Sequence, residues 1–271
     1  QWEKLLIDDI KIFDCVFALK RYDFDNLDYF HAETVNADRY IQSLEAGEDA
    51  EGIVESKLPF LRWLVSNSAL KNDSVLIKLS HYVGRMTVIS AGNAMRFRSR
   101  RIYDGFFETL ENDDKLRDLE DFFNTMGIEC NLILEKLPDG DRVLYFSHEK
   151  LVPFFDTASS GTLALFDLYR RLMPSVREPS FIYLDEFDAF YHYEMAENVI
   201  KFFKKKYPRC QVIMTSHNTN LMTNRLMRPD CLFILSRSGT LTALCNATER
   251  ELREGHNLEK MYISGEFEQY E

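Results

Sequence analysis

The segment that most constrains the fold is FIYLDEFDAFYH, residues 181–192. A run of four apolar residues, Phe181–Leu184, leads without alternation into two adjacent acids, Asp185 and Glu186. A short continuous apolar run of this kind predicts a strand that is buried on both faces, as in a parallel sheet. Because ligands of open α/β sheets bind beyond the carboxyl ends of the strands, we expect the two acids at a binding site.

The two acids suit the chemistry of nucleotide hydrolysis. Two carboxylates are costly to remove from water unless a cation or a polarised water uses them. In a Walker B strand, Asp185 would hold Mg²⁺, usually through water, and Glu186 would orient or deprotonate the water that attacks a γ-phosphate. The alternative is a strand that ends in solvated acids, with Glu186 starting the next helix.

Two further segments carry polar groups that could join this site. Ser159, Ser160 and Gly161 open an apolar-periodic helix, and free N–H groups at a helix start suit an anion such as phosphate. The same residues equally suit a plain helix N-cap. His217 follows the next apolar strand, Cys210–Thr215, where it could bind a γ-phosphate, hold the attacking water, or simply be a satisfied polar residue.

The rest of the pattern predicts an α/β protein. From residue 146 onward, the order strand–helix–strand–helix–strand predicts a parallel sheet with right-handed crossovers, whose last strand is Cys231–Leu235. Alternating residues predict a β-hairpin made of Glu129–Lys136 and Arg142–His148. Apolar residues at helical spacing predict that residues 1–80 are mostly helical.

Composition and charge narrow the class of protein. The chain has 271 residues, 28% charged and 13% aromatic, as expected of an ordered protein with one large domain or two. No apolar run approaches the ~20 residues of a membrane span, which predicts no membrane partner. Five scattered cysteines predict a reduced, cytoplasmic protein.

The net charge of −11 argues against a protein that coats DNA. A cluster of arginines could still contact a phosphate backbone or an acidic partner, or form a solvated helix face: Arg96, Arg98, Arg100 and Arg101.

In this order and spacing, the motifs resemble the second half of an ABC-type ATPase head of the SMC/RecF/OLD-like group. Ala158–Thr162 (ASSGT) resembles the signature loop, and Phe181–Glu186 resembles the Walker B strand with its catalytic glutamate. Asp188 matches the D-loop aspartate and His217 the switch histidine. The closer similarity is to stand-alone bacterial AAA-type ATP-binding proteins of phage-defence and toxin–antitoxin cassettes, through LDEFDAFYHYE, TSHNTNLM and GHNLEKMYISGEFE.

The resemblance implies an α/β fold, namely a P-loop NTPase (ABC-type) head with a parallel sheet. Residues 1–126 would form a mainly helical arm or lid, and residues 127–271 the signature and Walker B lobe. The reaction would be ATP hydrolysis with Mg²⁺, at a site shared across a homodimer or higher homo-oligomer. The implied site consists of Glu186 and His217 as catalytic residues, Asp185 as the metal ligand, and Ser159, Ser160, Gly161 and Asp188 at the nucleotide, with Ser159 and Gly161 acting on the partner's site.

By the same resemblance, ATP binding would clamp the dimer and control a partner effector, such as a nuclease or toxin, in anti-phage defence. Two other interpretations stay open. A RecF-like DNA-repair ATPase would need a basic DNA-facing surface, which only Arg85–Arg101 offers, so nucleic acid is not the favoured partner. A non-catalytic scaffold would only dimerise or bind a partner.

The chain departs from the family pattern at two places. The usual signature carries two glycines where this chain has Ser160 and Gly161. No glycine is followed by lysine, so the phosphate-binding loop G-x-x-x-x-G-K-[ST] is absent from the sequence. Because the first residue is Gln1 rather than Met, we expect this loop in sequence upstream.

Overall fold

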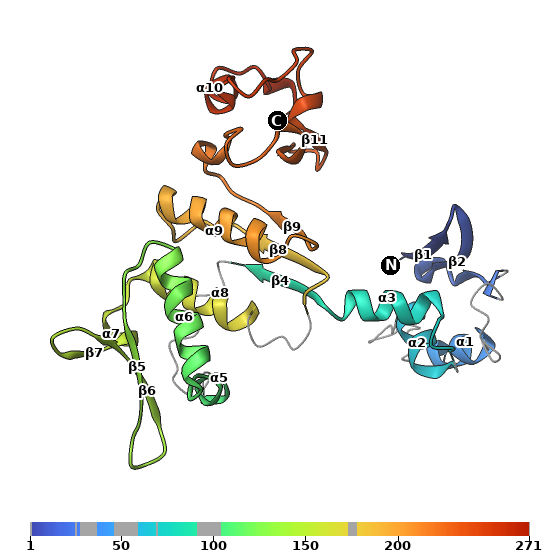
Figure 1. Cartoon of the computed structure of the whole chain (residues 1–271). Helices are drawn as coiled ribbons and strands as arrows, with labels where there is room; N and C mark the ends of the chain where they lie inside the picture. Colours follow the sequence, from blue (N-terminus) through green and yellow to red (C-terminus); the bar gives the residue numbers. More distant parts are fainter. Residues whose placement is uncertain are drawn as a thin grey trace. The chain divides into compact units, whose positions relative to one another are not determined.

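A computed structural model of the chain describes residues 2–24, 26–27, 37–45, 59–68, 70–90, 104–172 and 178–270 (Figure 1). The chain divides into two compact units, residues 1–85 and 86–271, and each is described by itself. The arginine cluster of residues 96–101 lies outside the described residues. No helix among the described residues is long and apolar enough to cross a membrane.

The first unit begins with an antiparallel sheet, and the helix predicted there from apolar spacing was wrong. Its strands lie in the order β1-β2-β3, and Asp8 and Asp9 connect the first two. Both aspartates have positive φ, which makes a tight hairpin turn whose twist matches the flanking strands. This local turn decided the structure against the helical spacing of the apolar residues. The elements are β1 Trp2–Ile7, β2 Ile10–Val16, the 3₁₀ turn η1 Phe17–Leu19, and β3 Arg21–Asp23.

Three helices complete the first unit and share one core with the sheet. The rings of Phe13 and Tyr40 each lie 4.9 Å from that of Phe60, and all three side chains are fully buried. The carboxylate of Glu3 on β1 accepts hydrogen bonds from the N–H groups of Phe60 at 2.6 Å and Leu61 at 2.9 Å. Glu3 therefore satisfies the first free N–H groups of α2 from the neighbouring sheet. The helices are α1 Ala37–Glu45, α2 Phe60–Asn67 and α3 Val75–Val83.

The second unit contains the predicted parallel sheet, in the strand order β4-β8-β9. Its central strand is the one that ends in Asp185, so the prediction of a parallel sheet around this strand is confirmed. The predicted third strand was wrong, because β4 occupies that place instead of the strand near residue 233. The strands are β4 Met86–Ser90, β8 Phe181–Asp185 and β9 Gln211–Met214.

The two faces of the parallel sheet are covered differently. Ile182 and Leu184 are buried in the core with residues of two long helices, α8 Ser160–Leu172 and α9 Tyr193–Lys206. On the neighbouring strands, Val88 of β4 is 66% exposed and Ile213 of β9 is 40% exposed. The prediction of a strand buried on both faces is therefore met on only one face within the described residues.

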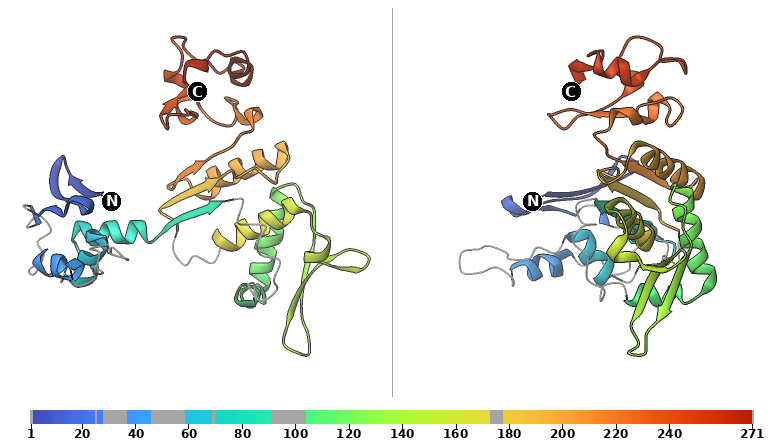
Figure 2. Two further views of the ribbon diagram at one scale, coloured as in Figure 1. Left: turned by 180° about the vertical axis from the view of Figure 1, so that it is seen from behind. Right: turned by 90° about the vertical axis from the view of Figure 1, so that its left-hand side faces the viewer.

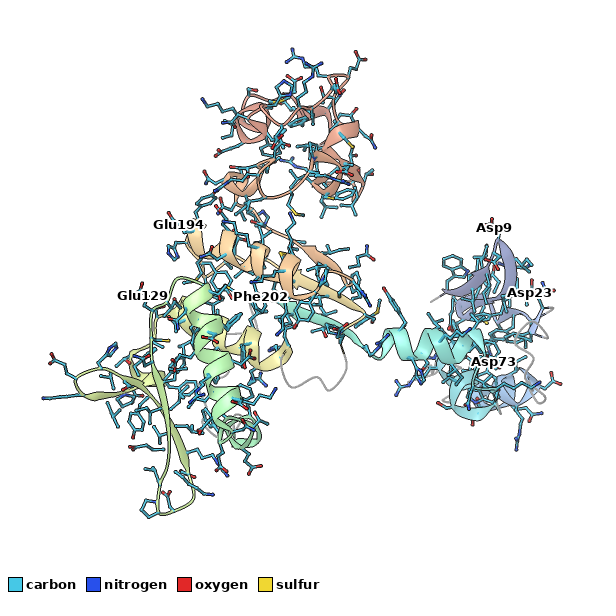
Figure 3. The ribbon with its side chains drawn as sticks, in the orientation of Figure 1. Asp9, Asp23, Asp73, Glu129, Glu194 and Phe202 are labelled. Atoms are coloured by element: carbon cyan, nitrogen blue, oxygen red, sulfur yellow. The ribbon has the colours of Figure 1, made fainter. Side chains whose placement is uncertain are left out.

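The core of this unit extends through an aromatic cluster around α6. Phe122 of α6 packs edge-on against Phe202 of α9, with ring centroids 5.0 Å apart. Figure 3 labels Phe202 on its helix. The predicted hairpin is confirmed as β5 paired with β6, and a third strand, β7, adds to it (Figure 2). The assignment of residues 1–126 as an arm and 127–271 as a lobe stays a prediction. These elements are α5 Asp104–Leu110, α6 Asp113–Thr125, β5 Leu132–Lys136, β6 Arg142–Ser147, β7 Leu151–Pro153 and α7 Phe154–Thr157.

The last part of the chain forms a small subregion with its own buried cluster. The strand predicted near residue 233 pairs antiparallel with the strand that follows it, because a short turn with positive φ at Gly239 joins them. Leu244, Leu258 and Phe267 are buried beneath this pair. The elements are η4 Thr219–Leu221, η5 Pro229–Cys231, β10 Phe233–Leu235, β11 Leu241–Ala243, η6 Leu244–Asn246, α10 Leu258–Ile263 and η7 Glu268–Tyr270.

Candidate functional site

Asp185 lies at the carboxyl end of β8, between hydroxyl groups from both neighbouring strands. Ser90, the last residue of β4, is paired with Asp185 in the sheet register, and its hydroxyl donates to Oδ2 at 3.3 Å. Thr215 directly follows β9, and its hydroxyl donates to Oδ1 at 3.1 Å. The hydroxyl of Tyr183 lies 3.5 Å from Oδ1. The carboxylate is therefore held in one orientation at the end of the sheet, as a ligand of a cation would need.

Glu186 turns the chain sharply away from the sheet. Its φ of 46° lies in the left-handed region, which a glutamate rarely adopts. Its N–H donates to the hydroxyl oxygen of Thr215 at 2.7 Å, and the N–H of Phe187 donates to the carbonyl of Thr215 at 3.1 Å. The next helix, α9, begins only at Tyr193. Glu186 is thus a turn residue with its side chain directed to solvent, and the alternative of a helix-starting acid does not hold.

His217 lies beside Glu186 at the same edge of the sheet. Its Nε2 is 3.6 Å from Oε1 of Glu186. The two side chains are 92% and 57% exposed, respectively. A carboxylate and an imidazole at this separation can both reach one water molecule or one phosphate oxygen placed between them and the solvent. The structure therefore brings Asp185, Glu186 and His217 together, while their catalytic roles stay predictions.

The segment Ser159–Gly161 forms the start of α8. The hydroxyl of Ser159 accepts a hydrogen bond from the N–H of Thr162 at 3.1 Å and shares another with the hydroxyl of Thr162 at 2.8 Å. This is the geometry of a helix N-cap, so the plain capping role proposed from the sequence is present. Ser160 is exposed on the first turn of the helix.

Gly161 connects this helix start with the turn that follows Glu186. A β-carbon at Gly161 would lie 2.8 Å from the carbonyl oxygen of Phe190, closer than a side chain allows. Asp188 lies half-buried in the same turn, and its carbonyl accepts from the N–H of Tyr191 at 2.9 Å. The predicted signature segment and the predicted D-loop residue therefore belong to two backbone segments in direct contact.

Ser90 and Thr215 were not among the residues predicted for the site. Both are hydroxyl residues at the carboxyl ends of strands, and that position is the signal that could have found them. For Thr215 the signal was within reach, because it immediately precedes the Ser216-His217 pair at the end of a predicted strand. Ser90 could not be placed, because its strand lies about ninety residues before β8 and the pairing of these two strands was not predicted.

The donor atoms at this site fit a magnesium ion that arrives with a nucleotide. No group of three or more His, Cys, Asp or Glu side chains suited to a metal occurs among the residues that the structure describes. Asp185 supplies one carboxylate, with the hydroxyls of Ser90 and Thr215 beside it. Mg²⁺ is usually bound by one or two carboxylates together with substrate phosphates and water, rather than by a cage of protein side chains.

Residues 106–223, somewhat less than half of the chain, match the model of a family described as "AAA domain, putative AbiEii toxin, Type IV TA system". Among solved structures, the chain is similar to the Smc head domain with an extended coiled coil bound to the C-terminal domain of ScpA, derived from Pyrococcus furiosus. That likeness is weak, with 15% identity and a TM-score of 0.32 over 44% of this chain. The match spans 31% of the length of the Smc head chain. The comparison with curated proteins gave no match.

The family match and the site coincide in the sequence. The matched segment contains Asp185, Glu186 and His217, and it also contains the capped start of α8. AAA domains are nucleotide-binding domains, and the mixed architecture with a parallel sheet agrees with one. The part of the chain that carries the site is therefore similar to an AAA-type P-loop NTPase domain.

Proposed function

We propose that this chain belongs to an ABC-type ATPase subunit that binds and hydrolyses ATP when the phosphate-binding loop absent from this sequence is also present. The observation that carries the proposal is the meeting of Asp185, Glu186 and His217 at the carboxyl ends of adjacent parallel strands. Asp185 is oriented by hydroxyls on both sides, whereas Glu186 and His217 lie open to solvent beside it. This combination supports a metal-binding carboxylate next to a base that can reach a water molecule.

The proposed roles follow from these positions. Mg²⁺, bound together with ATP, would neutralise charge on the phosphates. Asp185 would hold that ion through the oxygen atoms that Ser90 and Thr215 orient. Glu186 would accept a proton from the attacking water, and His217 would hold the same water or an oxygen of the γ-phosphate through Nε2. The 3.6 Å between Glu186 and His217 places both groups within reach of one such water.

A second copy of the chain would complete the site. In a single chain, the side chains of His217 and Glu186 are 92% and 57% exposed, so bulk water has free access to them. Phosphoryl transfer gains from excluding bulk water and from donors aimed at the phosphate. Ser160 is exposed on the first turn of α8, where it could face the phosphate of a partner. We therefore propose an ATP-gated homodimer or higher homo-oligomer.

The description of the matched family suggests a wider role. The family that residues 106–223 match is described as containing a putative AbiEii toxin of a type IV toxin–antitoxin system. We propose that ATP-dependent assembly of this chain controls a partner effector, a nuclease or toxin, in bacterial anti-phage defence. The cofactors are ATP and Mg²⁺, and the compartment is the cytoplasm.

The test is the substitution Glu186→Gln in a protein that also carries a phosphate-binding loop. The change keeps the shape of the side chain and removes its ability to accept a proton. We expect ATP binding to persist and turnover to fall by about 10²–10⁴-fold. Glu194→Gln is the matched control, because Glu194 is an exposed acid near the start of α9. Its turnover should equal that of the wild type. A wild-type protein that neither binds nor hydrolyses ATP, or a Glu186→Gln protein with native turnover, would overturn the proposal.

A further inference from the structure

We infer that Thr215 is a positioning residue that fixes the two acids of the site relative to each other. Its single hydroxyl contacts the carboxylate of Asp185 and the backbone of Glu186 at the same time. The inference rests on the proposed function, because it assigns Thr215 a role toward the acids that would bind Mg²⁺ and activate water. Thr215 would touch neither ATP nor the metal ion itself.

The direction of each hydrogen bond follows from the number of protons. A threonine hydroxyl carries one proton and two acceptor positions. The N–H of Glu186 can only donate, so the oxygen of Thr215 accepts that bond at 2.7 Å. The one hydroxyl proton is then available for Oδ1 of Asp185 at 3.1 Å. The hydroxyl thus acts as a bridge that uses its donor on one acid and an acceptor on the next.

The bridge coincides with the strained residue of the turn. Glu186 has a φ of 46°, an unfavourable conformation for a residue with a β-carbon. Strain of this kind persists only where the surrounding structure holds it. Two backbone hydrogen bonds also fix Thr215 here, from its own N–H to Leu184 and from the N–H of Phe187 to its carbonyl. These backbone bonds do not depend on the side chain, so a substitution at Thr215 isolates the contribution of the hydroxyl.

Two substitutions separate the hydroxyl from the rest of the side chain. Thr215→Val keeps the shape and the methyl group but cannot form the bridge. Thr215→Ser keeps the hydroxyl and loses the methyl group. A packing role for Thr215 would spare the valine variant and harm the serine variant, whereas a positioning role predicts the opposite order. Thr242→Val on β11 is the control for a threonine-to-valine change in a different sheet.

The first measurement needs no ligand. In the full-length deuterated protein, NMR hydrogen exchange of the Glu186 amide reports whether its hydrogen bond to Thr215 is present. We expect exchange at least about tenfold faster in Thr215→Val than in the wild type, with Thr215→Ser and Thr242→Val close to the wild type. Equal protection of the Glu186 amide in the valine variant would overturn the inference.

The second measurement follows the metal site in a protein that also carries a phosphate-binding loop, with Mn²⁺ and ATP as the probe and electron paramagnetic resonance as the readout. Thr215→Val should bind Mn²⁺–ATP about tenfold more weakly, as expected for the loss of a group that orients a metal-binding carboxylate. Thr215→Ser should restore the affinity. If the serine variant instead behaves like the valine variant, the inference is wrong. If the wild type binds no Mn²⁺–ATP, the proposed function fails, and the exchange of the Glu186 amide alone decides the role of Thr215.

Discussion

A β-carbon on Gly161 would lie 2.8 Å from the carbonyl oxygen of Phe190, so the start of α8 and the turn after Glu186 meet backbone to backbone. A glycine is required at this contact for its size, since α8 itself would tolerate any good helix former. The contact joins the two segments whose residues were predicted to contact nucleotide, Ser159–Gly161 and Asp188. A movement of either segment would therefore displace the other.

This contact predicts that Gly161→Ala destabilises the protein. The added methyl group must displace a backbone oxygen, and such overpacking typically costs about 1–3 kcal/mol. We expect the free energy of unfolding, measured by urea titration, to fall by an amount in that range. The loss would exceed the small gain that alanine brings over glycine in a helix.

Gly105→Ala is the matched control for this change. Gly105 lies in α5, and in the described part of the chain no atom outside its own helix backbone and chain neighbours would lie within 4 Å of a β-carbon there. We expect the same substitution to leave stability unchanged or raise it by up to ~1 kcal/mol, because alanine favours the helix. Equal stability of the Gly161→Ala protein and the wild type would show that the contact yields without cost.

Glu197 makes stability depend on pH. It lies on α9 with its side chain only 8% exposed, and it forms ion pairs with Lys201 and Arg225. The hydrogen bond from Lys201, followed by that from Tyr193 and the charge of Arg225, holds the pKa of this carboxyl below its ordinary value of 4.5. The folded state therefore binds this proton less readily than the unfolded state. The stabilisation is present above the ordinary pKa and is lost as pH falls through the lowered folded-state pKa.

We therefore expect Glu197→Gln to flatten the acid limb of the stability curve. Unfolding by urea would be followed from about pH 6 to about pH 3, where the wild type should lose stability more steeply than the variant. Glu194→Gln is the control, because Glu194 lies on the same helix (Figure 3). Its side chain is 75% exposed. An acid limb that is as steep in Glu197→Gln as in the wild type would rule out this carboxyl as its source.

The cysteines should differ strongly in reactivity. Burial raises the pKa of Cys15 to about 12 and that of Cys130 to about 11. Cys231 and Cys245 are exposed. Since the thiolate is the reactive form, iodoacetamide at about pH 8 should modify the exposed pair first and leave the buried pair intact until the protein unfolds. Mass spectrometry of tryptic peptides would check this order, and early labelling of Cys15 or Cys130 would contradict it.

Local patterns predicted the elements around the site well. The apolar run that ends in Asp185 forms β8, and α8 begins at Ser160, directly after the capping hydroxyl of Ser159. These features depend on residues close together in the sequence, where periodicity and capping act. The same local rules favoured a helix around Asp8 and Asp9, but their positive φ made a hairpin instead.

Long-range pairing could not be predicted in the same way. Ser90 lies opposite Asp185 because β4 joins the parallel sheet, although 95 residues separate them. The sequence of neither strand indicates which other strand it pairs with. The third strand of the parallel sheet was therefore predicted near residue 233 instead of at β4. The left-handed conformation of Glu186 was also unpredictable, because it accompanies a hydrogen bond to Thr215, which lies 29 residues away in the sequence.

The composite site can be tested by mixing two inactive proteins that both carry a phosphate-binding loop. If Ser159 and Gly161 of one protomer act on the ATP bound by the other, then Ser159→Arg blocks the site of the partner, and Glu186→Gln disables the site of its own chain. Each homodimer would lack a necessary group at both of its sites. In a heterodimer both defects fall in one site and the other site is whole. At equal mixing, roughly a quarter of wild-type turnover should return, since half of the dimers are mixed and each has one intact site.

The structure supplies the control that this experiment needs. The hydroxyl of Ser159 caps α8 through the N–H of Thr162, so Ser159→Arg also removes a cap worth about 1 kcal/mol. Ser159→Ala removes the same cap without adding bulk or charge. Urea unfolding of both variants shows how much of any loss of activity is due to lost stability.

Mixed dimers would be verified by affinity purification of one tagged protein, followed by identification of its partner by mass spectrometry. If Ser159→Arg alone hydrolyses ATP at the native rate, α8 does not act across the dimer. If verified heterodimers recover no activity, either the proposal of a composite site is wrong or hydrolysis needs both sites of a dimer. A covalently linked dimer with one intact site would distinguish these two explanations.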